Sequence, residues 1–305
     1  MPSELRLSGV YVPLITPFRA DGAVALDALE GLGHEALDQG AAGLVALSTT
    51  GETATLDEVE QAAVVDVCAR VCRERGAPLL VGAGGNDTAR ATRSVMGLTR
   101  WPEAVAALSV VPYYTRPSEE GIVRHFQRLA AISPVPLVVY NIPYRTGRNL
   151  GSASMRRLAA TPNVAGVKHA AGAIDQDTVE LLRDLPSGFA VLSGDDVLTF
   201  PLLCLGASGG ILASAHLATA RFAELVRRVA GGDLQGAREL AAALHPVAEA
   251  LFAEPSPAVL KGVLHAHGRI PTANLRLPMT AASPAAVERA LAASAAVSPR
   301  AGAPA

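Results

Sequence analysis

The sequence predicts an α/β protein: a (β/α)8 TIM barrel followed by a C-terminal helical appendage. Two observations carry this prediction. Short runs rich in Val, Leu and Ile recur along the chain, and a segment with helical spacing follows each run. Continuous apolar strands that alternate with amphipathic helices are typical of a parallel sheet covered by helices. Eight such units in about 230 residues fit a closed barrel better than an open doubly wound sheet. The expected strands are residues 9–18, 43–49, 78–84, 104–112, 136–143, 164–170, 189–196 and 206–214.

The segments between these runs complete the barrel, and further helical segments follow it. We expect three units of organisation: a barrel over residues 1–231 that carries the active site, helices over 232–296, and a small, Pro-rich tail over 297–305 that is disordered. The expected barrel helices are 26–40, 56–76, 87–100, 118–132, 154–160, 175–185, 197–206 and 216–232, and the expected C-terminal helices are 234–252, 256–268 and 283–296.

Composition excludes several classes of function. A net charge of −2 and a pI near 6.4 offer no electrostatic footprint for nucleic acid or an anionic membrane. No apolar run approaches the roughly 18 residues of a membrane span, and the N-terminus lacks a signal-peptide pattern, so we expect a cytoplasmic protein. Three cysteines suit a reducing compartment. Cys68 and Cys72 share a helix face and are interpreted as core residues. His265 and His267 lack a third ligand, so neither a metal nor a cofactor is expected.

In a TIM barrel the chemistry lies at the C-terminal ends of the strands, so the residues that end each apolar run are the candidates for the site. These ends are rich in hydroxyl groups and glycine, and they include one lysine. Glycines 206, 209 and 210 fit either a phosphate cradle or a close approach of the backbone to a small ligand. In chain order the ends are Thr16–Pro17, Ser48–Glu52, Gly82–Asn86, Pro112–Tyr114, Tyr140–Arg145, Lys168, Ser193–Asp196 and Gly209–Ile211.

Lys168 is the most informative of these residues. Only two of the 26 basic residues are lysines, Lys168 and Lys261, and the others are arginines. An amine among apolar residues has a lowered pKa and can attack a carbonyl to form an imine, whereas a guanidinium stays protonated. Lys261 lies in a helical stretch, where we expect a surface lysine whose apolar stem is covered.

The neighbouring strand ends supply what an imine mechanism needs. Tyr140, Tyr114 and Thr49 are hydroxyls that can relay protons, whereas a carboxylate would hold the lysine charged. Backbone N–H groups around Thr49–Gly51 can bind the carboxylate of an α-keto acid, and Arg145 can bind a second carboxylate. Thr49 and Thr50 are equally suited to cap the next helix.

An ordered set of motifs, extending from about residue 8 to 280, resembles the dihydrodipicolinate synthase / N-acetylneuraminate lyase family of lysine-dependent aldolases. The resemblance implies a homotetramer in which pyruvate forms an imine with Lys168. It further implies that Tyr140, Thr49 and a Tyr114 lent across the dimer interface relay protons. Thr50, Gly51, Arg145, Gly194 and Ile211 are then substrate-binding residues. The motifs are Thr49–Glu52, Pro112–Tyr114, Tyr140–Gly147, Gly166–Lys168, Ser193–Asp196 and the glycine turn before Ile211.

Arg145 favours the synthase branch, in which the corresponding arginine binds the carboxylate of aspartate semialdehyde. Three residues depart from that branch: Ser48 replaces a glycine, Tyr144 a small residue and His169 an acidic one. Because all three adjoin the expected site, aldolases or dehydratases acting on 2-keto-3-deoxy sugar acids or hydroxy-keto acids stay open. An inactive binding or regulatory paralogue is a third reading, although it would be expected to lack the lysine or a relay hydroxyl.

The resemblance also bears on inhibition by free lysine. Asn86 and Tyr113 match residues of the lysine-binding cleft of sensitive members. The position of the carboxylate in that cleft is Arg90, and the histidine positions are Glu58 and Gln61. An arginine repels the ammonium group of the ligand, so we expect weak inhibition.

Overall fold

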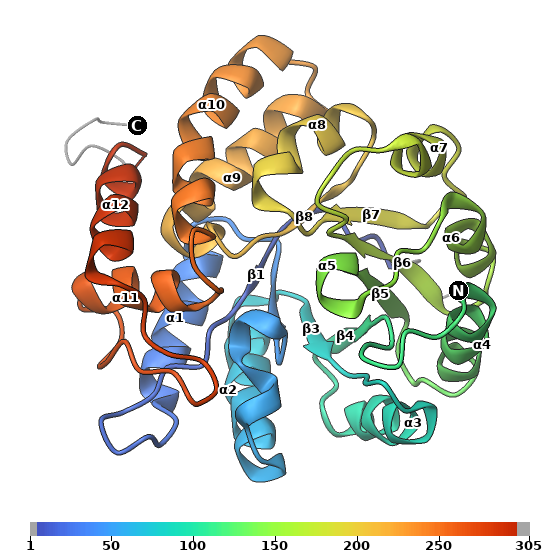
Figure 1. Ribbon diagram of the computed structural model, residues 1–305, viewed down its shortest axis with the longest axis horizontal. Helices are drawn as coiled ribbons and strands as arrows, with labels where there is room; N and C mark the ends of the chain where they lie inside the picture. Colours follow the sequence, from blue (N-terminus) through green and yellow to red (C-terminus); the bar gives the residue numbers. More distant parts are fainter. Residues whose placement is uncertain (1–4, 298–305) are drawn as a thin grey trace.

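A computed structural model describes residues 5–297 and shows a closed barrel of eight parallel strands. The strands follow one another around the barrel in chain order, and the last pairs with the first (Figure 1). Each expected strand is confirmed, although each is shorter than its apolar run because the run extends into the flanking loops. The strands are β1 (Gly9–Pro13), β2 (Gly43–Ala46), β3 (Leu79–Gly82), β4 (Ala104–Val110), β5 (Leu137–Asn141), β6 (Val164–His169), β7 (Ala190–Ser193) and β8 (Gly209–Ile211).

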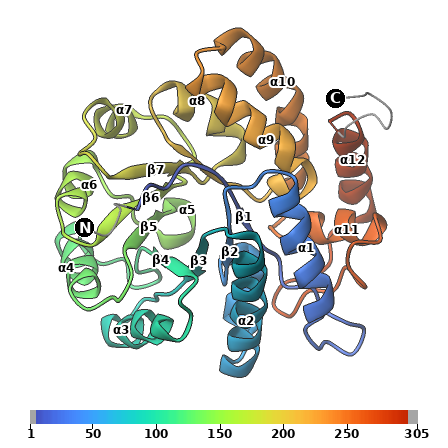
Figure 2. The ribbon, with the colours of Figure 1, turned by 180° about the vertical axis from the view of Figure 1, so that it is seen from behind.

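Helices surround the barrel, as Figures 1 and 2 show from opposite sides. Every expected barrel helix is present. One further short helix, α5 (Pro143–Thr146), directly follows β5 and was not expected. The helices that follow the eight strands are α1 (Leu26–Asp38), α2 (Glu58–Arg75), α3 (Thr88–Met96), α4 (Glu119–Ala130), α6 (Ser152–Ala159), α7 (Gln176–Arg183), α8 (Thr199–Cys204) and α9 (Ala215–Ala230).

Three C-terminal helices extend the barrel on one side: α10 (Leu234–Leu251), α11 (Ala258–Ala266) and α12 (Pro284–Ala295). Helix α10 packs against α9, and α12 packs against both α10 and α11. Val297, with which the expected tail begins, is buried, and residues 298–305 lie outside the described part of the chain.

The cap of α2 settles one alternative reading of the threonines at the end of β2. Asp57 accepts the backbone N–H of Glu60 at 2.8 Å, and the Glu60 carboxylate accepts the N–H of Asp57 at 3.1 Å. This reciprocal pair is a capping box. Thr49 and Thr50 instead form a separate 3-10 turn (Thr49–Gly51) that lies before α2, and they are free to serve the site.

Glycine in β8 reflects the closure of the barrel. A Cβ on Gly209 would lie 1.9 Å from the carbonyl oxygen of Gly9 on β1, so only glycine permits this approach of the two strands. Closure of the barrel therefore explains the glycine at position 209, and no phosphate or other ligand is needed to explain it.

Apolar side chains form two core clusters, one between the strands and the helices and one inside the barrel. Cys68 and Cys72 lie in the outer cluster, as expected, and Tyr11 lies in the inner one. Burial raises the pKa of the Cys72 thiol to about 12, so this cysteine is an inert core residue. No helix in the described chain is long and apolar enough to cross a membrane.

Candidate active site

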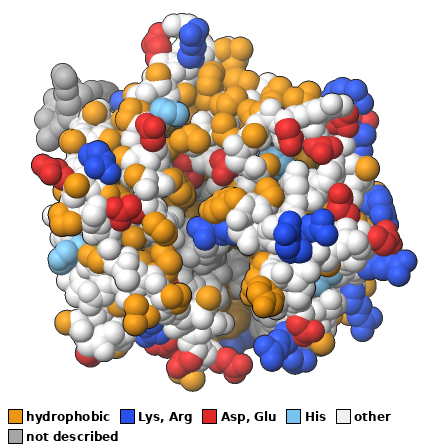
Figure 3. Space-filling model, in the orientation of Figure 1, with side chains coloured by type: hydrophobic (Ala, Val, Ile, Leu, Met, Phe, Trp, Pro, Cys, Tyr) orange, Lys and Arg blue, Asp and Glu red, His pale blue; other side chains and the backbone are white. Residues whose placement is uncertain are grey.

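A cavity of about 750 Å³ lies at the C-terminal ends of the strands and opens on the face seen in Figure 3. One wall comes from the barrel and carries most of the expected residues. The opposite wall comes from α10 and the segment after it, and sequence reasoning did not foresee it. The expected residues in the lining are Thr49, Thr50, Tyr140, Arg145, Lys168, Gly194 and Ile211, and the C-terminal wall consists of Ala248, Glu249 and residues 252–256.

Two expected residues lie outside this lining. Gly51 is buried behind the threonines, where a Cβ would lie 3.1 Å from the carbonyl oxygen of Leu14. Tyr114 follows β4 with a left-handed backbone (φ 69°), and it is 87% exposed. In a single chain, therefore, Tyr114 does not reach the pocket.

Lys168 lies on β6 directly beside Tyr140 on β5, because the two residues are partners in the strand register. The Lys168 Nζ is 4.2 Å from the centroid of the Tyr140 ring, and the residue is only 4% exposed. Burial lowers the pKa of Lys168 to about 8, although the negative charges of Asp196 and Asp195 oppose this shift. The neutral amine, which imine formation requires, is therefore far more populated near neutral pH than it is for a solvated lysine.

Gly194 makes room for this lysine. A Cβ at position 194 would lie 3.0 Å from the Cε and Cγ atoms of Lys168 and 2.9 Å from Ala170. The glycine after β7 thus allows the aliphatic chain of Lys168 to extend along the wall of the pocket.

Tyr140 remains a neutral phenol over the working pH range. Burial raises its pKa, and Arg145 and a hydrogen bond with Thr49 oppose that rise only partly. A neutral phenol both donates and accepts a hydrogen bond. Tyr140 and Thr49 can therefore pass a proton to or from a group bound at Lys168.

Two carboxylates lie at the site, beside the hydroxyl groups that we expected to relay protons. Asp196 is buried; one of its oxygens accepts the N–H of Ser214 at 2.6 Å, and the other has no partner in the described chain. Asp195 accepts the N–H of Gly172 at 2.8 Å. Burial raises the pKa of Asp196 to about 6. Neither carboxylate forms an ion pair with Lys168 within the described residues, so they moderate its charge without holding it as a salt bridge. The two adjacent aspartates that follow β7 were the feature of the sequence from which carboxylates at the site could have been predicted.

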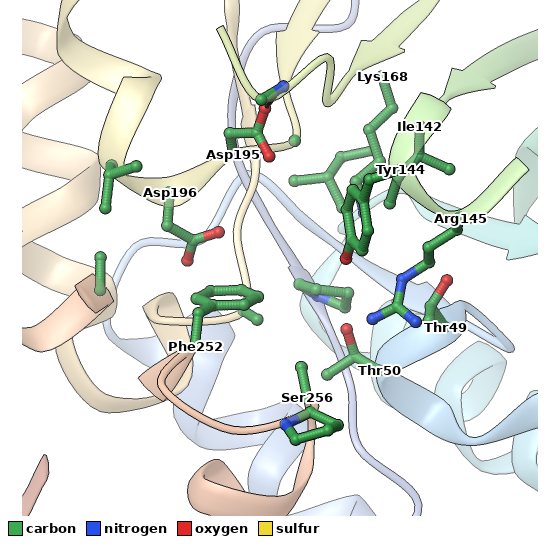
Figure 4. A pocket seen from close by; sticks show the side chains of 18 of the residues that line it. Thr49, Thr50, Ile142, Tyr144, Arg145, Lys168, Asp195, Asp196, Phe252 and Ser256 are labelled. Carbon is green, nitrogen blue, oxygen red and sulfur yellow. Dashed lines mark hydrogen bonds between the residues drawn. The ribbon is translucent and has the colours of Figure 1, made fainter. Parts of the chain in front are cut away.

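Arg145 and Tyr144 enter the pocket from α5, whose short turn follows β5 (Figure 4). The Arg145 guanidinium carbon lies 4.9 Å from the centroid of the Tyr144 ring. Arg145 makes no ion pair within the described chain, and Figure 4 shows it above Thr49 and Thr50, with Phe252 on the opposite wall. A cation without a partner in such a position suits the carboxylate of a ligand.

Of the three departures noted in the sequence, only Tyr144 lines the pocket. His169 is buried, and its Nε2 lies 3.0 Å from the Thr178 hydroxyl on α7. Ser48 is buried as well, below the threonine turn. His169 and Ser48 therefore do not line the pocket. His169 follows Lys168 on β6, where successive side chains point to opposite faces, and Ser48 lies in the loop after β2 with its side chain buried.

The expectation for Lys261 is also wrong. This residue is 0% exposed and pairs with the buried carboxylate of Glu52. The apolar residues around Lys261 on α11 were a sign of burial, but the helical pattern could not show its partner, which lies in the loop after β2, far away in the sequence. No group of three side chains in the described chain is suited to hold a metal ion.

Comparison with known proteins agrees with this geometry. Residues 6–295 match the model of the Dihydrodipicolinate synthetase family. The chain is 40% identical to 4-hydroxy-tetrahydrodipicolinate synthase 2 of Clostridium acetobutylicum over 275 residues, which is 90% of this chain and 95% of the relative. It is also 40% identical to 4-hydroxy-tetrahydrodipicolinate synthase of Neisseria meningitidis serogroup C, over 94% of this chain and 99% of the relative.

Solved structures give the same result. A dihydrodipicolinate synthase from Thermotoga maritima superposes with a TM-score of 0.91 at 33% identity, covering 95% of this chain and 99% of that one. A monomeric dihydrodipicolinate synthase variant superposes with the same TM-score and identity, covering 95% and 97%.

The buried amine predicts a pH dependence. Only neutral Lys168 attacks a carbonyl, so the rate of imine formation should rise with pH through about 8 and then level off. Asp196→Asn removes a negative charge that favours the ammonium form, so the pKa of Lys168 should fall and the rising limb should move to lower pH. Rates of pyruvate adduct formation across pH measure this effect.

The matched control is Asp184→Asn at the exposed end of α7, which should not change the pH range over which the rate rises. If the pH range over which the rate rises is unchanged or higher in Asp196→Asn, then Asp196 does not stabilise the ammonium form.

Proposed function

The chain belongs to the dihydrodipicolinate synthetase family, and we propose that it condenses pyruvate with L-aspartate semialdehyde through an imine on Lys168, as a 4-hydroxy-tetrahydrodipicolinate synthase. The observation that carries this proposal is a buried amine beside the neutral phenol of Tyr140, in a pocket that also holds the unpaired Arg145. In the cell this reaction belongs to lysine and diaminopimelate biosynthesis.

Imine formation uses Lys168 and the hydroxyl groups beside it. The neutral amine attacks the C2 carbonyl carbon of pyruvate, and the carbonyl oxygen leaves as water after two proton transfers. Tyr140, hydrogen-bonded to Thr49, lies beside the reacting nitrogen and carries these protons. Loss of a proton from the methyl group then gives an enamine, whose terminal carbon attacks the aldehyde carbon of the second substrate. The amino group of that substrate attacks C2, closes the ring and releases Lys168.

The turn after β2 binds the pyruvate carboxylate. Gly51 and Glu52 direct their N–H groups to the carbonyl oxygens of Ser48 and Thr49. The N–H groups of Thr49 and Thr50 make no such bond among the described residues, and both residues line the pocket. Unpaired N–H groups at the start of a turn are suited to an anion.

Arg145 binds the carboxylate of the semialdehyde, which gives the enzyme its preference for a charged aldehyde. Tyr144 narrows the pocket beside it, and Phe252 faces them from the C-terminal wall. An aldolase or dehydratase acting on 2-keto-3-deoxy sugar acids or hydroxy-keto acids is the second candidate, because Tyr144 and the acidic side chains of Asp195 and Asp196 line the space for the second substrate. Loss of turnover is disfavoured, since Lys168, Tyr140 and Thr49 share one pocket.

We further propose a cytoplasmic homotetramer in which Tyr114 enters the pocket of a partner subunit. The free state of all three cysteines supports a reducing compartment. Tyr113 and Tyr114 are both exposed aromatic residues beside the mouth of the barrel, where a partner would cover them.

The imine assignment predicts selective trapping. Borohydride added with pyruvate should attach a reduced adduct to the peptide containing Lys168, measured by mass spectrometry. Lys261 is an internal control: burial lowers its pKa to about 8 as well, but it is paired with Glu52 and sealed from the pocket. It should carry no adduct. Continued trapping of pyruvate by Lys168→Arg would disprove the mechanism.

The role of Arg145 predicts a change confined to the second substrate. Arg145→Lys loses the two-pronged geometry for a carboxylate, so kcat/KM for aspartate semialdehyde should fall by about 10- to 100-fold. Pyruvate adduct formation should stay near the wild-type rate. Steady-state kinetics with each substrate varied, together with trapping, separates the two steps. Equal use of uncharged aldehydes by the wild type would contradict the synthase assignment.

Free lysine should inhibit the enzyme weakly. Arg90 is exposed in the first turn of α3, and the Gln61 amide donates to the carbonyl oxygens of Leu56 at 3.0 Å and Thr53 at 3.3 Å, so neither is an anion available to an ammonium group. Initial rates over a lysine titration test this expectation, and Arg90→Glu should increase the sensitivity. Half-inhibition of the wild type at sub-millimolar lysine would show that the cleft binds lysine after all and that Arg90 does not exclude it.

A further inference from the structure

The second lysine of the chain forms part of a buried network that ends at the threonine turn. Lys261 on α11 pairs with Glu52, and both side chains are almost completely excluded from solvent. The Lys261 ammonium also donates to the carbonyl oxygen of Asn274 at 2.9 Å and lies 4.0 Å from the centroid of the Phe18 ring. The pair is therefore surrounded by fixed partners and does not open to the pocket.

Arg276 extends this network from the segment between α11 and α12, which runs past the start of α2 (Figure 1). Its backbone N–H donates to the second oxygen of Glu52 at 3.1 Å. Its guanidinium donates to the carbonyl oxygen of Thr55 at 2.8 Å and to the Glu60 carboxylate at 2.6 Å. The C-terminal segment thus contacts the β2–α2 loop at Glu52 and Thr55 and the first turn of α2 at Glu60.

Glu52 is under conformational constraint. It adopts a left-handed backbone (φ 52°, ψ 35°), which is unusual for a residue other than glycine and persists where the surroundings enforce it. Its N–H donates to the carbonyl oxygen of Thr49 at 3.1 Å, and the Thr16 hydroxyl donates to the carbonyl oxygen of Gly51 at 2.7 Å. Displacement of Glu52 would therefore displace the turn that presents Thr49 and Thr50.

An ion pair is a costly way to fill a buried site, because apolar residues of similar volume often stabilise a fold as well or better. An ion pair with hydrogen-bonded partners does, however, select one arrangement of a loop. We propose that Glu52 and Lys261 are positioning residues, which hold Thr49 and Thr50 in place for pyruvate and couple the C-terminal helices to the catalytic face. This inference rests on the proposed imine chemistry at Lys168, and neither residue touches the substrate.

Glu52→Gln tests the proposal, since it removes the charge and keeps the shape. We expect kcat/KM for pyruvate to fall by about 10- to 100-fold, because a misplacement of about 1 Å can cost about 100-fold. The rate of borohydride-trapped adduct formation should fall in parallel, while the adduct still forms on Lys168. KM for the aldehyde should change little, since Arg145 is held by α5. All assays are made where circular dichroism shows the variant to be folded.

The chain offers a matched control. Glu35 on α1 pairs with Arg269 of the same C-terminal segment at 2.7 Å, away from the threonine turn. Glu35→Gln makes the same chemical change and should leave the trapping rate near the wild-type value. A folded Glu52→Gln enzyme that traps pyruvate as fast as Glu35→Gln would overturn the proposal.

Arg276→Met provides a second test in case Glu52→Gln does not fold. Because the Arg276 side chain is partly exposed, the protein should tolerate its loss better than that of a buried group. The substitution still removes the hydrogen bond to Thr55 and the ion pair with Glu60. We expect KM for pyruvate to rise roughly three- to tenfold. Unchanged KM and trapping rate in this variant would overturn the proposed coupling of the C-terminal segment to the catalytic face. Failure of the wild type to trap pyruvate would instead refute the chemistry at Lys168, so the two failures are distinguishable.

Discussion

Desolvation of the Lys168 amine is the constraint on which the rest of the site depends. The closed barrel places this side chain at the end of β6 beside the Tyr140 ring, where an ammonium ion is poorly solvated. The resulting pKa of about 8 makes the amine a usable nucleophile. The surrounding groups are arranged to preserve this condition. Gly194 leaves space for the aliphatic chain, and Asp195 and Asp196 lie close enough to moderate the charge without pairing with it.

The two lysines show how tertiary context gives one residue type two functions. Burial lowers the pKa of both to about 8. Lys168 faces a pocket and makes no ion pair in the described chain, so its neutral form is free to react. Lys261 is held by Glu52 and by the carbonyl oxygen of Asn274, so it is committed to its partners. The difference in function comes from the partners and not from the burial.

Much of the fold was predictable because each strand and helix has a local signature. Eight apolar runs correspond to the eight strands, and the periodicity of the segments between them corresponds to the helices. Helix α5 was not predicted because it is a single turn after Pro143, too short to show a period. Lys168, Tyr140, Thr49, Thr50 and Arg145, which the motifs contain, line one pocket, since the ends of parallel strands meet on one face of a barrel.

The sequence by itself determined the barrel and the segments that form its strands and helices, because apolar runs and helical periodicity are local signals. Only the tertiary structure decided which residues face the pocket. It directed Tyr144 inward and His169 outward, brought Phe252 from the C-terminal segment to the opposite wall, and buried Lys261 against Glu52. These outcomes depend on contacts between segments far apart in the chain, and neither periodicity nor motif spacing carries information about such contacts.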